Sequence, residues 1–293
     1  MTRTSRPTGA HGPSGSAGVP GRACAVLAAL AAALVPAFVF APGPLAARMS
    51  GGGFGDRRAL VGSLSESFVD YWSSGDRDFS PSLQRVVDYW LDYHLVKAVI
   101  AAALLAVLTT LGVLLWRAFL RAGRVGAVGT AALASAGILV TALALLSAAA
   151  VMANIQGAVA PFSSLLSMLP MRVSHGELAD ALDQIRRYLA DYPDSGERTP
   201  PAVEVMVSDF SRYHAVMAVA AMTVAAVLAG TGVVSWKRSA RAGASDGRAM
   251  RVFRSFGLLS ALLSSAAIVV AVANLTTAVG PAPALRAFFD GGW

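Results

Sequence analysis

The sequence has few charged residues for its length. Only 14% of its 293 residues are Asp, Glu, Lys or Arg, whereas a soluble globular chain carries about 25%. The mean hydropathy is +0.58. This deficit excludes an ordinary soluble domain and indicates that lipid surrounds much of the chain.

Cysteine is almost absent too. The single cysteine, Cys24, excludes an intramolecular disulfide and a cysteine-based metal cluster. It precedes the first apolar run, whereas the lipidated cysteine of a bacterial lipoprotein follows such a run, so we expect no lipid anchor. Arginine greatly outnumbers lysine and alanine is abundant, which is typical of a GC-rich bacterial genome.

Acidic residues are missing from five long apolar runs. A spanning helix needs about 20 apolar residues, and the only full charge inside the runs is Lys97, within a turn of a predicted helix end. The sequence therefore predicts an all-α, multi-pass membrane protein with five transmembrane helices, at residues 25–41, 95–116, 125–153, 215–235 and 256–273.

The same runs lack other features that would suggest chemistry. Ion-coupled transporters usually carry buried carboxylates or broken helices, but these runs hold no acid, and their only internal proline is Pro36. They also show no convincing arrangement of Ser, His and Asp for nucleophilic catalysis. Both absences disfavour a secondary transporter and an intramembrane enzyme.

The charges that are present are unevenly distributed. The N-terminal tail and the short segments 117–124 and 236–255 hold 12 Arg or Lys and one acid, whereas the long segments 42–94 and 155–214 hold 10 Arg and 15 acids. Basic residues remain on the cytoplasmic side of a membrane. We therefore expect a cell (inner) membrane protein with a cytoplasmic N-terminus, acidic external segments and an extracytoplasmic C-terminus. The net charge of +7 then indicates contact with anionic lipid headgroups, not with nucleic acid.

Residues 1–23 are rich in Ser, Thr, Gly and Pro and lack acids. This composition predicts a disordered cytoplasmic tail. The tail and the apolar run 25–41 also match a cleavable secretory signal peptide with a basic start. We favour a retained helix, because the internal repeat described next makes this run equivalent to the third and fifth spans.

A repeat at an offset of 120 residues runs through the chain without a gap from residue 93 to residue 161. Upstream, DYWSSGDR (70–77) recurs after a slip of one residue as DYPDSGER (191–198).

The repeated unit contains two spans, so both copies enter the membrane in the same direction. This predicts a pseudo-twofold axis along the membrane normal. We divide the chain into a first unit (24–122), a second unit (123–243) and a partial third unit (244–293). The matched positions include Tyr93-His94 with Tyr213-His214, Trp116 with Trp236, Asn154 with Asn274, and Pro161 with Pro281.

The two external segments show amphipathic helix patterns. Apolar residues recur at helical spacing, and a glycine that can adopt positive φ follows at Gly75 and at Gly196. Pro81 or Pro201 then begins the next helix. The sequence predicts two small extracytoplasmic helical caps of about 50 residues, each too small to be stable alone, so we expect each to pack on the membrane surface or on its twin.

His94 and His214, with Asn154 and Asn274 at the same depth, are the first candidate site. They could bind a metal or an anion, but each copy has one histidine without a partner at ligand spacing. Amphipathic rings collect at headgroup level, so we favour an interfacial anchor. The asparagines can be explained as C-terminal helix caps.

The repeated external phrase supplies the second candidate site, with Asp70 and Arg77 in one copy and Asp191 and Arg198 in the other. Its acids could bind calcium, but their spacing does not match the twelve-residue EF-hand loop. We favour a solvated turn in which each arginine pairs with neighbouring acids. No metal or cofactor is expected at either site.

These observations predict a non-enzymatic membrane protein whose external caps bind or sense a partner, or serve as an assembly platform. Its expected partners are the lipid bilayer and another membrane or extracytoplasmic protein. The alternative is a transporter or permeation component for a small or lipidic solute, which a cleft between the duplicated hairpins would favour. A membrane-embedded hydrolase or metalloenzyme would require His94 and His214 to converge within about 5 Å of each other or of carboxylates.

Overall fold

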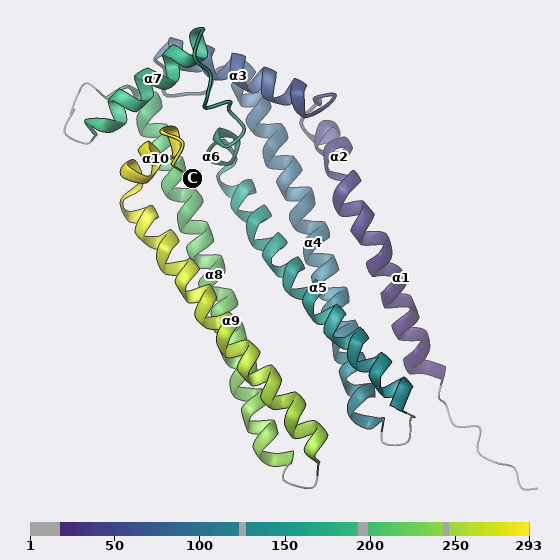
Figure 1. The fold of residues 1–293 in the computed structure, drawn as a ribbon. Coiled ribbons are helices and arrows are strands. Elements are labelled where there is room, and N and C mark those ends of the chain that lie inside the picture. The colour runs from purple at the N-terminus through teal and green to yellow at the C-terminus, as the bar shows by residue number, and fades with distance from the viewer. Residues whose placement is uncertain (1–17, 123–126, 193–198, 243–245, 293) are drawn as a thin grey trace, which may run out of the picture.

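The computed structural model (Figure 1) describes residues 18–122, 127–192, 199–242 and 246–292, and within these ranges it contains helices and no strand. Five of its helices are long enough and apolar enough to cross a membrane. The prediction of an all-α, multi-pass membrane protein is therefore confirmed. The five helices are α1 (Gly18–Phe40), α4 (Pro81–Arg121), α5 (Ala127–Val159), α8 (Pro201–Ala242) and α9 (Gly247–Val279).

Helices α4 and α8 are much longer than their predicted spans. They contain 41 and 42 residues, which corresponds to about 60 Å at 1.5 Å per residue. The hydrocarbon core of a bilayer is about 30 Å thick. About half of each helix therefore extends beyond the apolar span, and this half begins at Pro81 or Pro201, as the sequence predicted.

The shorter helices gather at one end of the bundle (Figure 1). Together with the N-terminal halves of α4 and α8 they form what we call the cap layer, and we call the opposite end the loop end. Three of the short helices begin at a proline that follows the end of a spanning helix after one intervening residue, and at the first position of a helix the missing amide proton costs nothing. The short helices are α2 (Pro42–Met49), α3 (Arg57–Ser74), α6 (Pro161–Leu166), α7 (Glu177–Ala190) and α10 (Pro281–Phe289).

Helix α3 shows how local sequence sets an element's ends. The carboxylate of Asp56 accepts a hydrogen bond from the amide of Ala59 at 2.8 Å, which caps the start of the helix. The helix ends at Gly75, whose φ of 70° lies in the left-handed region. The turn predicted at Gly75 is present, and the one predicted at Gly196 lies outside the described residues.

The largest apolar core lies in the cap layer rather than between the spans. Its side chains come from both predicted external segments and from the C-terminal helix, so the two expected caps form one layer with a shared core. This explains how segments too small to be stable alone are stabilised. The largest of its side chains exposed by 1% or less are Leu64, Phe68, Tyr71, Leu83, Phe162, Leu165, Leu166, Leu182, Ile185, Met206, Leu285 and Phe289.

The spanning helices form two hairpins, α4 with α5 and α8 with α9, and α1 packs on α4. In each hairpin a tryptophan lies against a glycine. A Cβ atom at Gly137 would lie 3.0 Å from the Trp116 ring, and one at Gly257 would lie 2.9 Å from the Trp236 ring. Small residues let membrane helices approach closely, so these contacts set the hairpin spacing.

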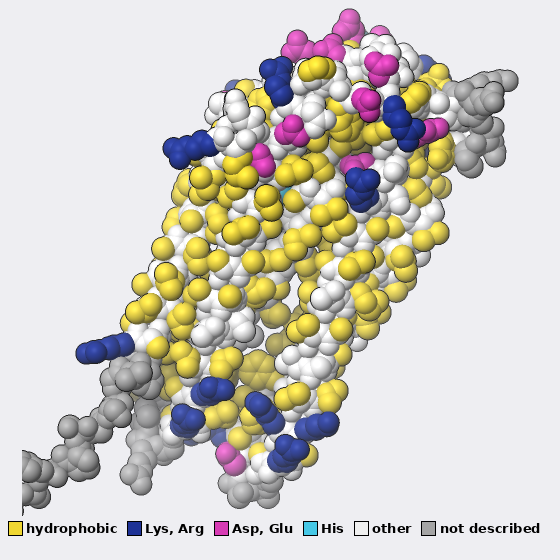
Figure 2. Space-filling model, turned by 180° about the vertical axis from the view of Figure 1, so that it is seen from behind, with side chains coloured by type: hydrophobic (Ala, Val, Ile, Leu, Met, Phe, Trp, Pro, Cys, Tyr) yellow, Lys and Arg dark blue, Asp and Glu magenta, His cyan; other side chains and the backbone are white. Residues whose placement is uncertain are grey.

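The two hairpins meet through α5 and α8 and separate toward the loop end (Figure 1). Figure 2 shows acidic side chains over the cap layer, an apolar middle, and Lys and Arg gathered at the loop end. Many large apolar side chains of the middle are exposed, including Val99, Ile138 and Val227 at 62%, 62% and 64%. Such a surface requires lipid.

Candidate functional site

His94 lies where α4 enters the cap layer and takes part in a chain of hydrogen bonds. Its Nδ1 is 3.0 Å from Oδ1 of Asn154, and its Nε2 is 3.5 Å from Oγ of Ser164 on α6. The indole of Trp90 donates to Ser164 Oγ at 3.0 Å, and Asn154 Nδ2 donates to the carbonyl of Ala150 at 2.7 Å. A neutral imidazole with its proton on Nδ1 satisfies every group in this chain.

The ring of His94 also lies flat against the backbone of α5. A Cβ atom at Gly157 would lie 2.7 Å from three atoms of the ring. No larger residue fits at position 157 without moving the imidazole. Glycine here therefore allows the histidine to reach Asn154, one helical turn away.

His214 repeats the central contact in the second hairpin. Its Nδ1 is 2.8 Å from Oδ1 of Asn274, and Asn274 Nδ2 donates to the carbonyl of Val270 at 2.9 Å. The surroundings differ, because the positions 120 residues after Trp90 and Ser164 hold Phe210 and Ala284. Phe210 packs on the imidazole with ring centroids 4.5 Å apart. One histidine thus lies in a polar chain and the other beside an apolar ring.

The interpretation of Asn154 and Asn274 as helix caps is wrong. Helices α5 and α9 continue to Val159 and Val279, so both asparagines lie inside a helix. Their amides instead bond the histidine of the same hairpin and the carbonyl four residues earlier. Within the described ranges, no group of three His, Cys, Asp or Glu side chains is placed to hold a metal ion.

Polar contacts join the first hairpin to α8 beside these histidines. The buried amide of Gln156 donates to the carbonyl of Tyr213 at 3.1 Å. The carboxylate of Asp209 accepts from the amide of Ser163 at 2.8 Å, which satisfies a free donor at the start of α6. The junction between hairpins is therefore specific at the cap-layer end.

The ion pair of Arg77 differs from the predicted one. Its Nη1 is 2.9 Å from Oε2 of Glu204, which lies 127 positions away on α8. Arg77 therefore pairs with this distant acid and not with the acids next to it in the sequence. The pairing joins the two predicted external segments, as does the hydrogen bond of 3.1 Å from the Trp72 indole to Gln184. Arg198 lies outside the described residues.

Tyr71 lies beside the turn that follows α3 at Gly75. Its hydroxyl donates to the carbonyl of Arg77 at 3.3 Å, and its ring is 1% exposed. Burial raises the pKa of Tyr71 to about 12, opposed by the nearby charge of Arg77 and reinforced by that of Asp78. The repeated phrase therefore includes a core residue as well as its exposed charges.

The candidate acids are exposed. Asp70 lines a polar pocket of about 430 Å³ on the cap layer, together with Glu66 and Arg85. Asp191 follows the last residue of α7. Arg186 of α7 ties the C-terminal helix into the layer, because its Nε donates to the carbonyl of Phe289 at 2.9 Å.

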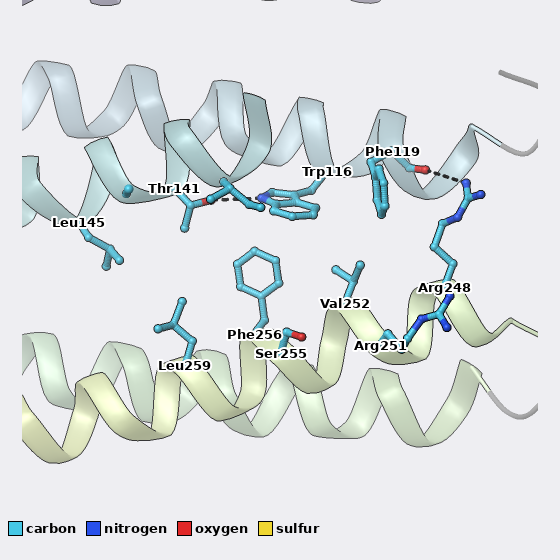
Figure 3. Close-up of a pocket in the computed structure, with 12 residues that line it drawn as sticks. Trp116, Phe119, Thr141, Leu145, Arg248, Arg251, Val252, Ser255, Phe256 and Leu259 are labelled. Atoms are coloured by element: carbon cyan, nitrogen blue, oxygen red, sulfur yellow. Dashed lines mark hydrogen bonds between the residues drawn. The ribbon is translucent and has the colours of Figure 1, made fainter. Parts of the chain in front are cut away.

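A second cavity, of about 620 Å³, opens between the hairpins at the loop end (Figure 3). We call it the cleft. Side chains of α4 and α5 form one wall and side chains of α9 form the other. Trp116 and Phe256 approach each other across it with ring centroids 5.1 Å apart. Two arginines, Arg248 and Arg251, stand at its basic end.

Sequence reasoning missed three groups of residues: the partners Trp90, Ser164 and Gly157 of His94, the tryptophan–glycine contacts, and the arginines of the cleft. The sequence contained a signal for the paired helix contacts. The His–Asn spacing is 60 residues and the Trp–Gly spacing is 21 residues in both hairpins. Nothing in the sequence indicated the cleft, which depends on how the hairpins diverge.

Comparison of the chain with protein-family models, with curated proteins and with solved structures finds no match. The function must therefore be argued from the geometry of the chain itself.

Proposed function

We propose that this protein is a non-enzymatic binding or sensing platform of the cell membrane. Its cap layer faces the outside and contacts another membrane or extracytoplasmic protein, while the loop end and N-terminus face the cytoplasm. The observation that carries the proposal is the shared core of the cap layer, which includes side chains from both external segments.

The orientation is supported by charge. The basic residues of the loop end would be unfavourable to translocate, and the acids of the cap layer would not. The proposed inside is therefore the end where Arg248, Arg251 and Arg254 begin α9.

The proposed duplication is supported by recurring contacts. The His–Asn pair and the Trp–Gly contact occur once in each hairpin at matching positions. Two similar hairpins that enclose a cleft at one end can change their separation there by parting Trp116 from Phe256. A partner that binds the cap layer and favours one arrangement of α3 against α7 would then bias the spacing of the hairpins.

The pocket beside Asp70 is the proposed contact point. A photo-crosslinking amino acid at Asp70 should form a discrete adduct in intact cells. The same probe at Asp180, an exposed acid of α7 that does not line this pocket, should not. Arg85→Gln should reduce the Asp70 adduct without changing the melting temperature. Equal adducts at both positions, or none at either, would contradict the platform.

The cleft favours a second candidate, a transporter or permeation component for a small or lipidic solute. The route from the cleft to the outside would have to pass the packed cap layer, where Phe162 and Met206 are fully buried. Proteoliposomes loaded with a fluorescent short-chain phospholipid can test this. Exchange between leaflets faster than in protein-free vesicles would support transport over the platform.

A further inference from the structure

The cleft has the properties of a site for one phospholipid. Its walls are apolar: Trp116, Phe119 and Leu145 lie on one side and Val252, Phe256 and Leu259 on the other (Figure 3). The hydroxyl of Thr141 is already used, because it accepts from the Trp116 indole at 3.1 Å and donates to the carbonyl of Gly137 at 2.7 Å. The wall therefore offers little to a polar solute at this depth.

The cleft extends from the arginines into one leaflet. Below the arginines its lining along α9 runs from Val252 to Leu259, seven residues later, which is about 10 Å of helix. Half of a hydrocarbon core of about 30 Å is about 15 Å. An acyl chain that entered beside the arginines would therefore be covered along much of its depth in this leaflet.

The two arginines supply a headgroup site. Arg248 uses one of its nitrogens within the protein. Its Nη1 lies 3.5 Å from the carbonyl oxygen of Phe119 and 3.4 Å from that of Ala122, at the C-terminus of α4. Arg251 is exposed, and within the part of the chain that the structure describes it makes no ion pair. Basic pockets between spanning helices bind anionic headgroups.

We propose that the cleft between the hairpins binds one anionic phospholipid, with its phosphate at Arg251 and Arg248 and an acyl chain lying along the Trp116 and Phe256 rings. The lipid fills the gap that the diverging hairpins leave, and Arg248 contacts both its phosphate and the carbonyls at the end of α4. This site lies at the opposite end of the bundle from the cap layer, so it stands whether or not the platform function is correct.

The test uses the full chain, delipidated in mild detergent and titrated with phosphatidylglycerol or with phosphatidylcholine, with bound lipid counted by native mass spectrometry. Wild type should bind one phosphatidylglycerol in preference to phosphatidylcholine. Arg251→Gln should weaken this binding roughly fivefold, the size of effect expected from one basic residue at an anionic headgroup. Inorganic phosphate should not compete, because it lacks the acyl chain.

Arg254→Gln is the matched control, since Arg254 is an exposed arginine on the same helix that does not line the cleft. It should leave binding unchanged. Ser255→Trp should fill the cleft and abolish binding, with the melting temperature confirming that the protein is folded. Equal losses in the Arg251 and Arg254 variants would show diffuse surface attraction and overturn the proposal. Competition by free phosphate, or binding that survives both Arg251→Gln and Ser255→Trp, would overturn it as well.

Discussion

His94 and Gly157 show how little room separates α4 from α5 near the cap layer. The imidazole lies on the glycine backbone, and both of its nitrogens have hydrogen-bonding neighbours, in Asn154 and Ser164. A buried polar chain of this kind rigidifies a junction only when every member is satisfied. The glycine therefore matters for the polar contacts as much as for packing.

Gly157→Ala should destabilise the protein by about 1–3 kcal/mol, because the new methyl group overlaps the imidazole and forces it away from Asn154. The control is Gly230→Ala, also in a spanning helix, where a Cβ atom would meet nothing within 4 Å. That variant should be neutral or more stable by about 0.5–1 kcal/mol. Melting temperatures in detergent measure both, and a Gly157 variant as stable as wild type would contradict the role of this contact.

Tyr71 predicts a dependence of stability on alkaline pH. Its pKa in the folded protein is about 12, above the value of 10.0 for a free side chain, chiefly because of burial. Between these values the unfolded chain loses the phenol proton while the folded chain keeps it, so stability present below pH 10 is lost as the pH rises toward 12.

The comparison that isolates this effect is Tyr71→Phe. As the pH rises from 10 to about 12, the melting temperature of wild type should fall. The melting temperature of Tyr71→Phe should fall less over the same range. An identical alkaline fall in wild type and Tyr71→Phe would show that burial of this phenol does not control the transition.

Helix ends in the cap layer follow local chemistry. Proline begins α2, α6 and α10, and a glycine at positive φ ends α3. These signals could be taken from the sequence because each acts within a few residues of backbone. The partners of the helices could not, since Arg77 pairs with a glutamate 127 positions away.

Gly75→Val should lower the melting temperature and the yield of folded protein, because a β-branched residue at φ 70° costs on the order of 1–3 kcal/mol. A Cβ atom at Gly75 meets nothing within 4 Å, so the cost comes from the backbone alone. Gly75→Asn should be nearly neutral, since asparagine tolerates this conformation.

Arg77→Ala provides the contrast within the same phrase. Its ion pair with Glu204 is exposed, and such pairs contribute about 0–1 kcal/mol. We expect Arg77→Ala to fold normally and Gly75→Val not to. A well-folded but inactive Arg77→Ala protein would instead place the active surface at this turn.

The whole molecule is polarised, with an acidic cap layer at one end and a basic loop end at the other (Figure 2). Its core is concentrated in the cap layer, and its hairpins diverge below it. The hairpins are joined by polar contacts of Gln156 and Asp209 at the cap-layer end, whereas at the loop end Trp116 and Phe256 meet across an open cleft. Both proposals, a partner at the cap layer and a lipid in the cleft, use this asymmetry.

Thiol labelling in intact cells tests the orientation. After Cys24→Ala removes the native thiol, Ser74→Cys on the cap layer should react with a membrane-impermeant reagent. Ala242→Cys at the loop end should react only after permeabilisation, because basic residues favour the cytoplasmic side of a membrane. Labelling of Ala242→Cys in intact cells would reverse the orientation.

The sequence by itself determined the helical class, the five spans and the turn at Gly75. It did so because solvent preference and backbone preference act over windows of a few to about 20 residues. Only the tertiary structure decided that His94 meets Asn154, that the two predicted external segments share one core, and that the hairpins leave a cleft. These contacts join residues about 60 or more positions apart, and they depend on how whole helices are oriented, which no local pattern specifies.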